Sequence, residues 1–223
     1  MKVIKAKIKA KIKSALQRQS IRRRGFWFVD VPRTSSTSIK NELSDRFGTA
    51  FGKGGTGLSF IDHTPAFKMR EVLGPRTWDK LYKFSIVRNP WARTVSFYRH
   101  AQGTGFFTDY TFVEFVRQID AQFETGESVF SWHGPYEGSL YYLEDSAGNL
   151  LVDKIVRFED RESGLREVGE RIGYPEIGRV LLLNQSRGAD SSCSEYYDDE
   201  SRRVIEKVYA REIEQFSYEF DGI

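Results

Sequence analysis

The chain has 223 residues, of which 39% are hydrophobic and 29% are charged. This balance is typical of a folded globular protein, excludes a disordered chain and suffices for one well-buried domain. The single cysteine, Cys193, cannot form an internal disulfide, and no apolar run approaches the roughly 18 residues that span a bilayer. Because the N-terminus also lacks the apolar segment of a signal peptide, we expect a cytoplasmic protein.

Residues 1–24 form a basic arm that differs from the rest of the chain. The arm holds six lysines, four arginines and no acid, a charge of +10, so the remainder carries −7 against the net +3 of the whole chain. Aliphatic residues recur in it at every fourth position: Ile4, Ile8, Ile12 and Leu16. This spacing predicts an amphipathic helix, although residues 5–13 also alternate as a strand would. Residues 25–223 are predicted to form a single domain. The helix of the arm either lies on an anionic membrane or packs on this domain. Nucleic-acid binding is not expected, because the arm has no aromatic residue to stack on a base.

Strands and helices alternate along the remainder. The expected elements are a buried strand at 25–31, a helix at 37–47, a glycine-rich loop at 51–57, a buried strand at 82–87, a helix at 91–101 begun by Pro90, a helix at 107–123, a hairpin at 140–160 with its turn at 145–149, and helices near 160–173 and 197–215. Strands that alternate with helices predict a three-layer α/β domain with a central parallel sheet flanked by helices.

The first expected strand is followed by a loop rich in hydroxyl groups. Its sequence is PRTSSTS, in which Pro32 and Arg33 precede Thr34, Ser35, Ser36, Thr37 and Ser38. Capping of the next helix explains one or two of these hydroxyls. The free N–H groups at a helix start, further hydroxyl donors and the forked charge of an arginine together suit a phosphate or sulfate group. The segment therefore predicts an anion cradle, although it lacks the G-x-x-x-x-G-K-[ST] pattern of a Walker loop.

The second expected buried strand is followed by RNPWARTVS, residues 88–96. Arg88 stands at the strand end and Ser96 a little over two helical turns later, so both side chains can converge on a further anion. Ligands bind at this carboxyl edge in open α/β sheets. The alternative interpretation is that Arg88, Arg93 and Arg99 are surface charges.

Together the two loops resemble the PAPS-dependent sulfotransferases, most closely the branch of carbohydrate sulfotransferases and their bacterial relatives. In that family a loop reading P-K-T-G-G-T-S grips the 5′-phosphosulfate, and R-N-P-[WY]-x-R-x-x-S binds the 3′-phosphate. Residues 88–96 match the second motif at every named position. In the first loop Arg33 replaces the lysine, and Ser35 and Ser36 replace the glycines. Similar segments at 155–160, 183–188 and 216–220 extend the resemblance from about residue 25 to the end.

The resemblance implies a P-loop-like fold and the transfer of a sulfuryl group from PAPS to an acceptor hydroxyl without a metal. The branch of the family that the chain resembles implies that this hydroxyl belongs to a carbohydrate. It implies that the nucleotide is held by Arg33, Thr34, Ser35, Ser36, Thr37, Ser38, Arg88, Ser96, Ser186 and Arg187. Arg33 also acts in catalysis, by stabilising charge on the leaving phosphate.

Three histidines are candidates for the base: His63, His100 and His133. By the resemblance, His63 is the catalytic base, because it precedes a short helix that ends in Leu-Gly; the alternative is that it caps or packs at that helix start. Asp62 is placed to orient it. We expect His100 to be structural and His133 to lie in an acceptor loop.

Two other functions stay open at this point. One is a kinase-like nucleotide phosphotransferase, against which the missing Walker pattern stands. The other is a catalytically inactive module that binds a nucleotide or polyanion, because the serines that replace the glycines bring side chains to a tight phosphate loop. The aromatic segments 106–115 and 130–142 line a sugar platform or belong to the core.

Overall fold

Three parallel strands, in the order β1-β2-β3, form the centre of the molecule. The structure is a computed structural model that describes residues 19–48, 63–127, 137–179 and 193–220. Its elements are β1 (Phe26–Val29), α2 (Ser36–Phe47), α3 (Ala66–Leu73), α4 (Pro75–Trp78), β2 (Tyr82–Val87), α5 (Pro90–Gly103), α6 (Phe112–Thr125), α7 (Ser139–Leu143), β3 (Lys154–Arg157), α8 (Arg161–Ile172), the 3-10 turn η2 (Cys193–Tyr196), α10 (Asp199–Val208) and α11 (Ala210–Phe216).

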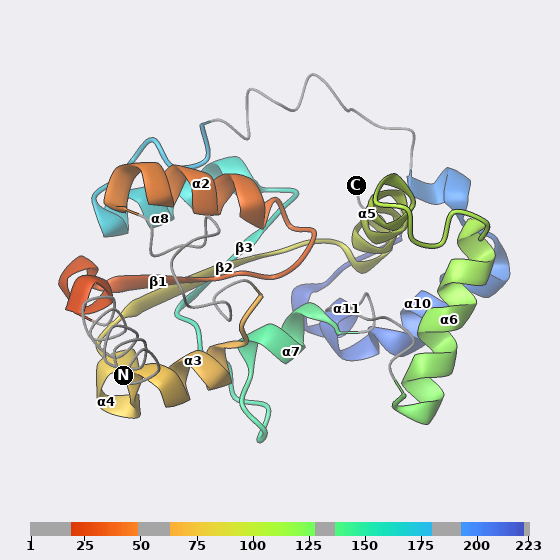
Figure 1. Ribbon diagram of the computed structural model, residues 1–223, viewed down its shortest axis with the longest axis horizontal. Helices are drawn as coiled ribbons and strands as arrows, with labels where there is room; N and C mark the ends of the chain where they lie inside the picture. Colours follow the sequence, from red (N-terminus) through yellow and green to blue (C-terminus); the bar gives the residue numbers. More distant parts are fainter. Residues whose placement is uncertain (1–18, 49–62, 128–136, 180–192, 221–223) are drawn as a thin grey trace, which may run out of the picture.

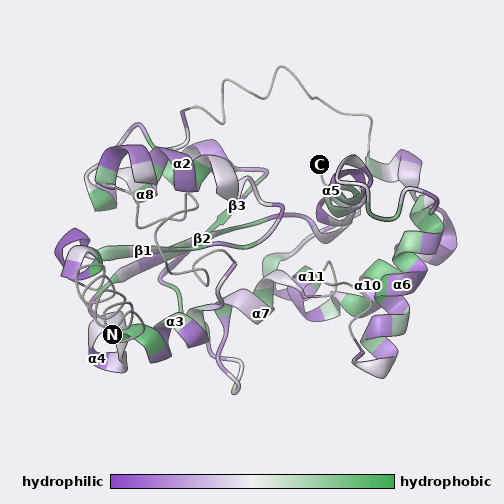
Figure 2. Cartoon of the chain, viewed as in Figure 1, coloured by the Kyte–Doolittle hydropathy of each residue, from purple (hydrophilic) through white to green (hydrophobic). Residues whose placement is uncertain are grey.

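The sheet is covered on both faces. Helices α2 and α8 lie over one face, and α3, α4 and α7 lie on the other side (Figure 1). All four residues of β1 and five of the six residues of β2 are buried, as expected for parallel strands between two helical layers. Hydrophobic residues gather along β1, and the helices carry both hydrophobic and hydrophilic residues (Figure 2). The predicted three-layer α/β fold with a central parallel sheet is confirmed.

A second group of helices, α5, α6, α10 and α11, lies beyond the carboxyl ends of the strands, on the right of Figure 1. The helix predicted at 107–123 begins later, at Phe112, because Thr111 and Glu114 form a capping box: the Thr111 Oγ1 accepts from the Glu114 N–H at 3.3 Å, and the Glu114 carboxylate accepts from the Thr111 N–H at 2.8 Å. The helix predicted at 197–215 begins at Asp199 and is divided at Tyr209 into α10 and α11.

The hairpin predicted at 140–160 is wrong in its first arm. Residues of that arm form the short helix α7, and only an isolated antiparallel bridge joins Glu144 to Leu150. The turn is present, since the Asp145 Oδ1 accepts from the Ala147 N–H at 3.0 Å. After it the chain leaves the bridge, and the Asp153 N–H donates to Lys83 O at 2.8 Å to start β3 as a parallel partner of β2. The second arm of the predicted hairpin is therefore the third strand of the sheet, paired with β2 and not with the first arm.

The end of the basic arm packs on the domain. Residues 19–24 are helical, and Ile21 is only 2% exposed within the hydrophobic core. Residues 1–18, with their predicted amphipathic helix, and the glycine-rich loop at 51–57 lie outside the described residues. Among the residues that are described, no helix has the length and apolar content needed to cross a bilayer.

Candidate active site

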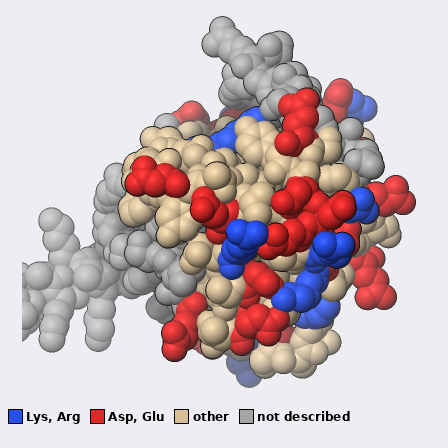
Figure 3. Space-filling model, turned by 90° about the vertical axis from the view of Figure 1, so that its right-hand side faces the viewer, with Lys and Arg blue, Asp and Glu red and all other residues tan. Residues whose placement is uncertain are grey.

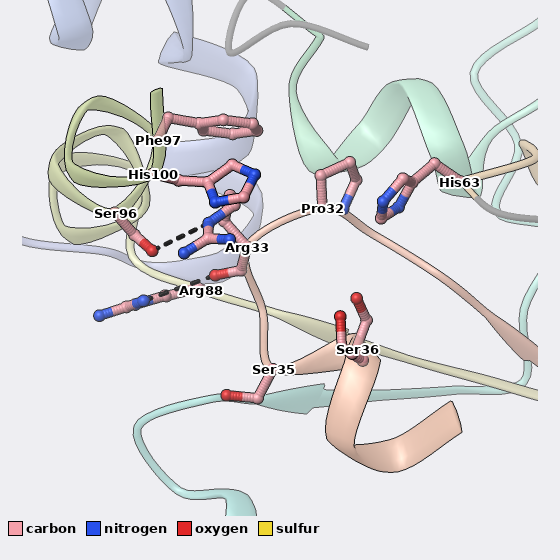
Figure 4. A pocket seen from close by; sticks show the side chains of 10 residues that line it. Pro32, Arg33, Ser35, Ser36, His63, Arg88, Ser96, Phe97 and His100 are labelled. Atoms are coloured by element: carbon pink, nitrogen blue, oxygen red, sulfur yellow. Dashed lines mark hydrogen bonds between the residues drawn. The ribbon is translucent and has the colours of Figure 1, made fainter. Parts of the chain in front are cut away.

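One cavity of about 480 Å³ lies at the carboxyl edge of the sheet, where β1 and β2 end. It is lined by Pro32, Arg33, Ser35, Ser36, Thr37, His63, Arg88, Ser96, Phe97 and His100 (Figure 4). The two loops singled out in the sequence therefore meet in the same cavity, because the parallel strands that precede them are neighbours in the sheet.

The hydroxyl residues of the first loop divide between structure and cavity. Thr34 is fully buried and donates its hydroxyl hydrogen bond to Val31 O at 2.9 Å, which closes the turn. Ser35 is the N-cap of α2 but makes no side-chain capping bond. Ser35, Ser36 and Thr37 instead line the cavity, whereas Ser38 does not. Helix capping therefore does not explain this run of hydroxyls, and three of them present donors to the cavity beside the N-terminus of α2.

Backbone strain is concentrated at this cavity. Five non-glycine residues of the described segments have a positive φ, and three of them line the cavity: Arg33 (66°), Ser35 (64°) and His63 (52°). A left-handed conformation costs roughly 1–2 kcal/mol for a residue with a Cβ atom. Ser35 adopts the conformation that suits a glycine, whereas Ser36 is already the first residue of α2. Strain of this kind is found at functional sites, where surrounding contacts maintain it.

The second loop is held by conventional helix-start contacts. The fully buried Asn89 accepts hydrogen bonds from Trp91 N at 3.0 Å and Ala92 N at 3.4 Å through its Oδ1, so it caps α5. Its Nδ2 donates to Glu219 O at 2.8 Å, near the described C-terminal end. Pro90 occupies the first turn, where its missing N–H is not needed. These contacts fix the direction in which α5 leaves the sheet and so place Ser96 in the cavity.

Two arginines bring positive charge into the cavity. Arg33 Nε donates to Ser96 Oγ at 3.1 Å, and Arg88 Nη1 donates to Arg33 O at 3.5 Å (Figure 4). The Arg88 guanidinium stacks 4.5 Å from the Phe158 ring centre. Burial lowers the pKa of both side chains, and the charge of Glu159 only partly opposes this for Arg88. Neither arginine forms a salt bridge with a carboxylate of the described residues, and the buried Arg88 Nε has no hydrogen-bond partner among them, so the cavity can accept an anion.

His63 is oriented by Asp30, which follows β1. The His63 Nδ1 lies 3.1 Å from Asp30 Oδ1, and the His63 N–H donates to Asp30 Oδ2 at 3.3 Å. Lys40 of α2 also contacts Asp30 Oδ2. Burial opposes ionisation of Asp30, but the hydrogen bond and charge of His63, together with Lys40, hold the pKa of this carboxyl well below its ordinary value. An ionised Asp30 thus holds the Nδ1 side of the ring.

Asp30 was not among the residues predicted from the sequence. The signal was a single acid at the end of the apolar run FWFVDV, where a buried carboxylate needs a partner. Asp62, the residue predicted to orient His63, lies outside the described residues, as do His133, Ser186 and Arg187.

His100, which was expected to be structural, lines the cavity. It stands one helical turn after Ser96 on α5, and Figure 4 shows it beside Arg33 and Phe97, across the cavity from His63. Burial, and then the charge of Arg33, lower its pKa, which favours the neutral imidazole.

The other arginines of the second motif have structural contacts. Arg93 is buried, with its Nη1 3.6 Å from Glu212 Oε1, and Arg99 Nε donates to Tyr196 Oη at 2.9 Å on the surface. Arg93 is therefore a core residue, not the surface charge that the alternative interpretation assumed. The described residues contain no group of histidine, cysteine, aspartate or glutamate side chains that could hold a metal ion.

Comparison with known proteins identifies the family. A family model described as "Sulfotransferase family" matches residues 21–219, which is most of the chain. The chain therefore belongs to the sulfotransferase family, and the resemblance inferred from the two loops is confirmed. The protein is a transferase of sulfuryl groups in the general sense that the family defines. No curated protein and no solved structure matched the chain.

Proposed function

We propose that this protein transfers the sulfuryl group of PAPS to an acceptor hydroxyl, with His63 as the general base. The observation that carries the proposal is the convergence, in one cavity, of two half-buried arginines that form no salt bridge with a described carboxylate and a histidine fixed by a buried carboxylate. PAPS offers two anionic groups at the ends of one nucleotide, which suits two cationic loops.

The residues present fit these two groups. Arg33, the cavity-lining hydroxyls and the amides at the start of α2 would hold the 5′-phosphosulfate. Arg88 and Ser96 would hold the 3′-phosphate, with Ser186 and Arg187 as further contacts. Ser35 adopts the left-handed backbone that a glycine would adopt. The serine in place of the family's glycine therefore adds strain but keeps the conformation of the turn.

The proposed reaction is an in-line displacement at sulfur. The acceptor oxygen forms a bond to sulfur while the bond between sulfur and the bridging phosphate oxygen breaks, and His63 Nε2 receives the hydroxyl proton. Asp30 stabilises the resulting imidazolium, since it is ionised and 3.1 Å from Nδ1. Arg33 stabilises the charge that develops on the departing 3′,5′-adenosine diphosphate.

A carbohydrate is the proposed acceptor, and the cytoplasm is the proposed location. The branch resemblance favours a sugar hydroxyl. Segment 106–115 contains both core and surface rings: Phe112 and Phe115 are buried, whereas Phe106 and Tyr110 are exposed. Tyr141 of α7 is also exposed, and exposed rings can pack on sugar faces. The first part of segment 130–142 lies outside the described residues.

Calorimetric titration with 3′,5′-adenosine diphosphate, without metal and with ATP as the reference nucleotide, tests the nucleotide site. We expect selective binding that weakens at least about tenfold in Arg88→Ala, which removes a charged contact. Arg99→Ala, which removes an exposed arginine of the helix that follows Arg88, is the matched control and should bind normally. An unchanged dissociation constant in Arg88→Ala, or a preference for ATP with magnesium, contradicts the proposal.

The base is tested separately with His63→Ala. Transfer of label from PAPS to a panel of oligosaccharides should fall by about 10²–10⁴-fold, while binding of 3′,5′-adenosine diphosphate stays near normal. Turnover equal to that of the wild type would remove His63 from the mechanism. Tight nucleotide binding by the wild type without transfer to any acceptor would instead favour the inactive binding module.

A further inference from the structure

A second, smaller cavity lies among basic side chains far from the first. It has a volume of about 320 Å³ and is lined by Arg22, Arg76, Thr77, Lys80 and Leu81. Three of these five residues are cations, and none is acidic. Arg22 is fixed in place, because its Nη2 donates to Thr77 Oγ1 at 3.0 Å. We refer to Arg22, Arg76 and Lys80 as the basic cluster.

The basic cluster marks the amino edge of the sheet. Arg22 belongs to the helical turn just before β1, and Lys80 precedes β2 by two residues. Gly25 O accepts a hydrogen bond from Tyr82 N at 2.8 Å, which joins the two strand starts. Because the strands are parallel, the cavity that contains His63 lies at the opposite edge. Figure 1 shows this separation, with α4 at one end of the molecule and α5 toward the other.

The charge of this end differs from that of the rest of the domain. Residues 19–24 carry +3 and residues 66–80 carry +2, although residues 25–223 as a whole carry −7. The nearest acid in sequence, Asp79, faces Arg70 instead, at 3.8 Å. No described carboxylate forms a salt bridge with any member of the basic cluster.

The opposite end neutralises its cations. Helices α6, α10 and α11 together carry −3, and Figure 3 shows acidic and basic side chains interspersed over that face. Arg117 Nε lies 2.7 Å from Glu200 Oε1, and Lys207 Nζ lies 2.7 Å from Glu124 Oε1. The three members of the basic cluster thus have no salt bridge to a described carboxylate, whereas Arg117 and Lys207 at the opposite end are paired.

We infer that the basic cluster binds the phosphate of a lipid headgroup and that this end of the protein docks on an anionic phospholipid surface. The sequence that leads into Arg22 supports a membrane over a soluble anion. Residues 1–18 add +7 without an acid and carry an aliphatic residue at every fourth position, a pattern that suits the interface between headgroups and acyl chains. A nucleic acid is disfavoured because residues 1–24 offer no aromatic ring for stacking. This orientation directs the carboxyl-edge cavity away from the bilayer, where an acceptor can reach it.

Vesicle flotation with the full chain tests the inference. The probes are vesicles of neutral phosphatidylcholine and vesicles that contain about one-third phosphatidylglycerol. The wild type should float with the anionic vesicles only, and binding should fall as salt rises from about 50 to 500 mM. Arg76→Glu/Lys80→Glu should weaken the partition at least about tenfold, because each cation near such a surface contributes measurably. Ile8→Glu/Ile12→Glu should also weaken it, because the inference places the aliphatic stripe in the interface.

The matched control is Arg166→Glu/Arg203→Glu, which makes the same charge change on exposed residues of α8 and α10. It should bind vesicles within about threefold of the wild type. Equal loss in both double variants would show a net-charge effect and overturn the inference. Binding of inorganic phosphate or a DNA duplex at the cluster without vesicle binding would also overturn it. Unchanged affinity of every variant for 3′,5′-adenosine diphosphate shows that folding is intact and separates this result from the proposed function.

Discussion

The two loops at the carboxyl edge reach the same cavity by opposite means. The second loop has the usual residues of a helix start, since the Asn89 side chain caps α5 and Pro90 is the first residue of that helix. The first loop lacks these features. Arg33 and Ser35 both have a left-handed backbone, and the side chain of Ser35, the N-cap residue, makes no capping hydrogen bond to α2. The side chain of Asn89 therefore maintains the second loop through neutral hydrogen bonds, and the backbone N–H of Asn89 donates to Glu159 Oε1 at 2.8 Å. The first loop depends on the charged contacts of Asp30 and Arg33.

This difference indicates a division of labour. A loop that is stable by itself can serve as a fixed anchor, which in the proposed function holds the 3′-phosphate. A strained loop presents backbone and side-chain donors in a geometry that an unstrained turn does not provide, and in the proposed function these donors face the 5′-phosphosulfate. Substitutions in each loop test whether the two differ in this way.

Among substitutions in the two loops, the largest effect is expected from Arg33→Ala. Loss of a preorganised cation at the reacting phosphate should lower kcat by about 10²–10³-fold. Arg33→Lys should recover part of the rate, since it restores charge but not the fork that reaches Ser96. Steady-state kinetics with PAPS checks this. A kcat within about threefold of the wild type in Arg33→Ala would place Arg33 outside the mechanism.

Asp30→Asn tests the charged support of the first loop. It leaves Lys40 and the partly exposed His63 without their carboxylate and should cost about 3 kcal/mol at neutral pH. Because the pKa of Asp30 is depressed on folding, its contribution is present above the ordinary value near 3.8 and is lost as the pH falls through the lower folded value. Urea unfolding from about pH 6 to about pH 2 should show the onset of this loss in the wild type once the pH falls below about 4. An equally steep loss in Asp30→Asn contradicts the assignment.

Asn89→Ala tests the neutral support of the second loop. Three hydrogen bonds of a fully buried side chain disappear, so unfolding should require about 2–3 kcal/mol less. Asn89→Ser keeps a capping oxygen but not the bond to Glu219, and its loss should be intermediate. Chemical denaturation measures both. A cost below about 0.5 kcal/mol would mean that the loop is held by something else.

Ser35→Gly should have the smallest effect and the opposite sign. Relief of the left-handed strain, less the added entropy of the unfolded glycine, should stabilise the protein by about 0.5–1 kcal/mol. Ser36→Gly is the matched control: it lies in the first turn of α2 and should be neutral or destabilising by up to about 1 kcal/mol. Thermal unfolding compares the two. Destabilisation by Ser35→Gly would show that the serine hydroxyl matters more than the strain.

Much of the site was predictable because its residues follow strands that are recognisable locally. The apolar runs at 25–31 and 82–87 predicted two parallel strands, and parallel strands bring the segments after their carboxyl ends together. Arg33 and Arg88 are therefore expected at one edge of the sheet from their positions in the chain. The 91–101 helix was likewise predictable from Pro90.

The alternation of strands and helices, the two loops that line the cavity and the sulfotransferase family all follow from local sequence, since each depends on contacts or patterns within a few residues. Contacts between distant residues settle the rest. Asp30 and His63 are 33 positions apart yet share a hydrogen bond. Residues 140–143 became a helix because Ser139 binds the buried Glu212, with its N–H 2.6 Å from the carboxylate, and β3 pairs with β2 instead of closing a hairpin. Short apolar runs suit a strand or a buried helix equally, so the packing around them makes the choice.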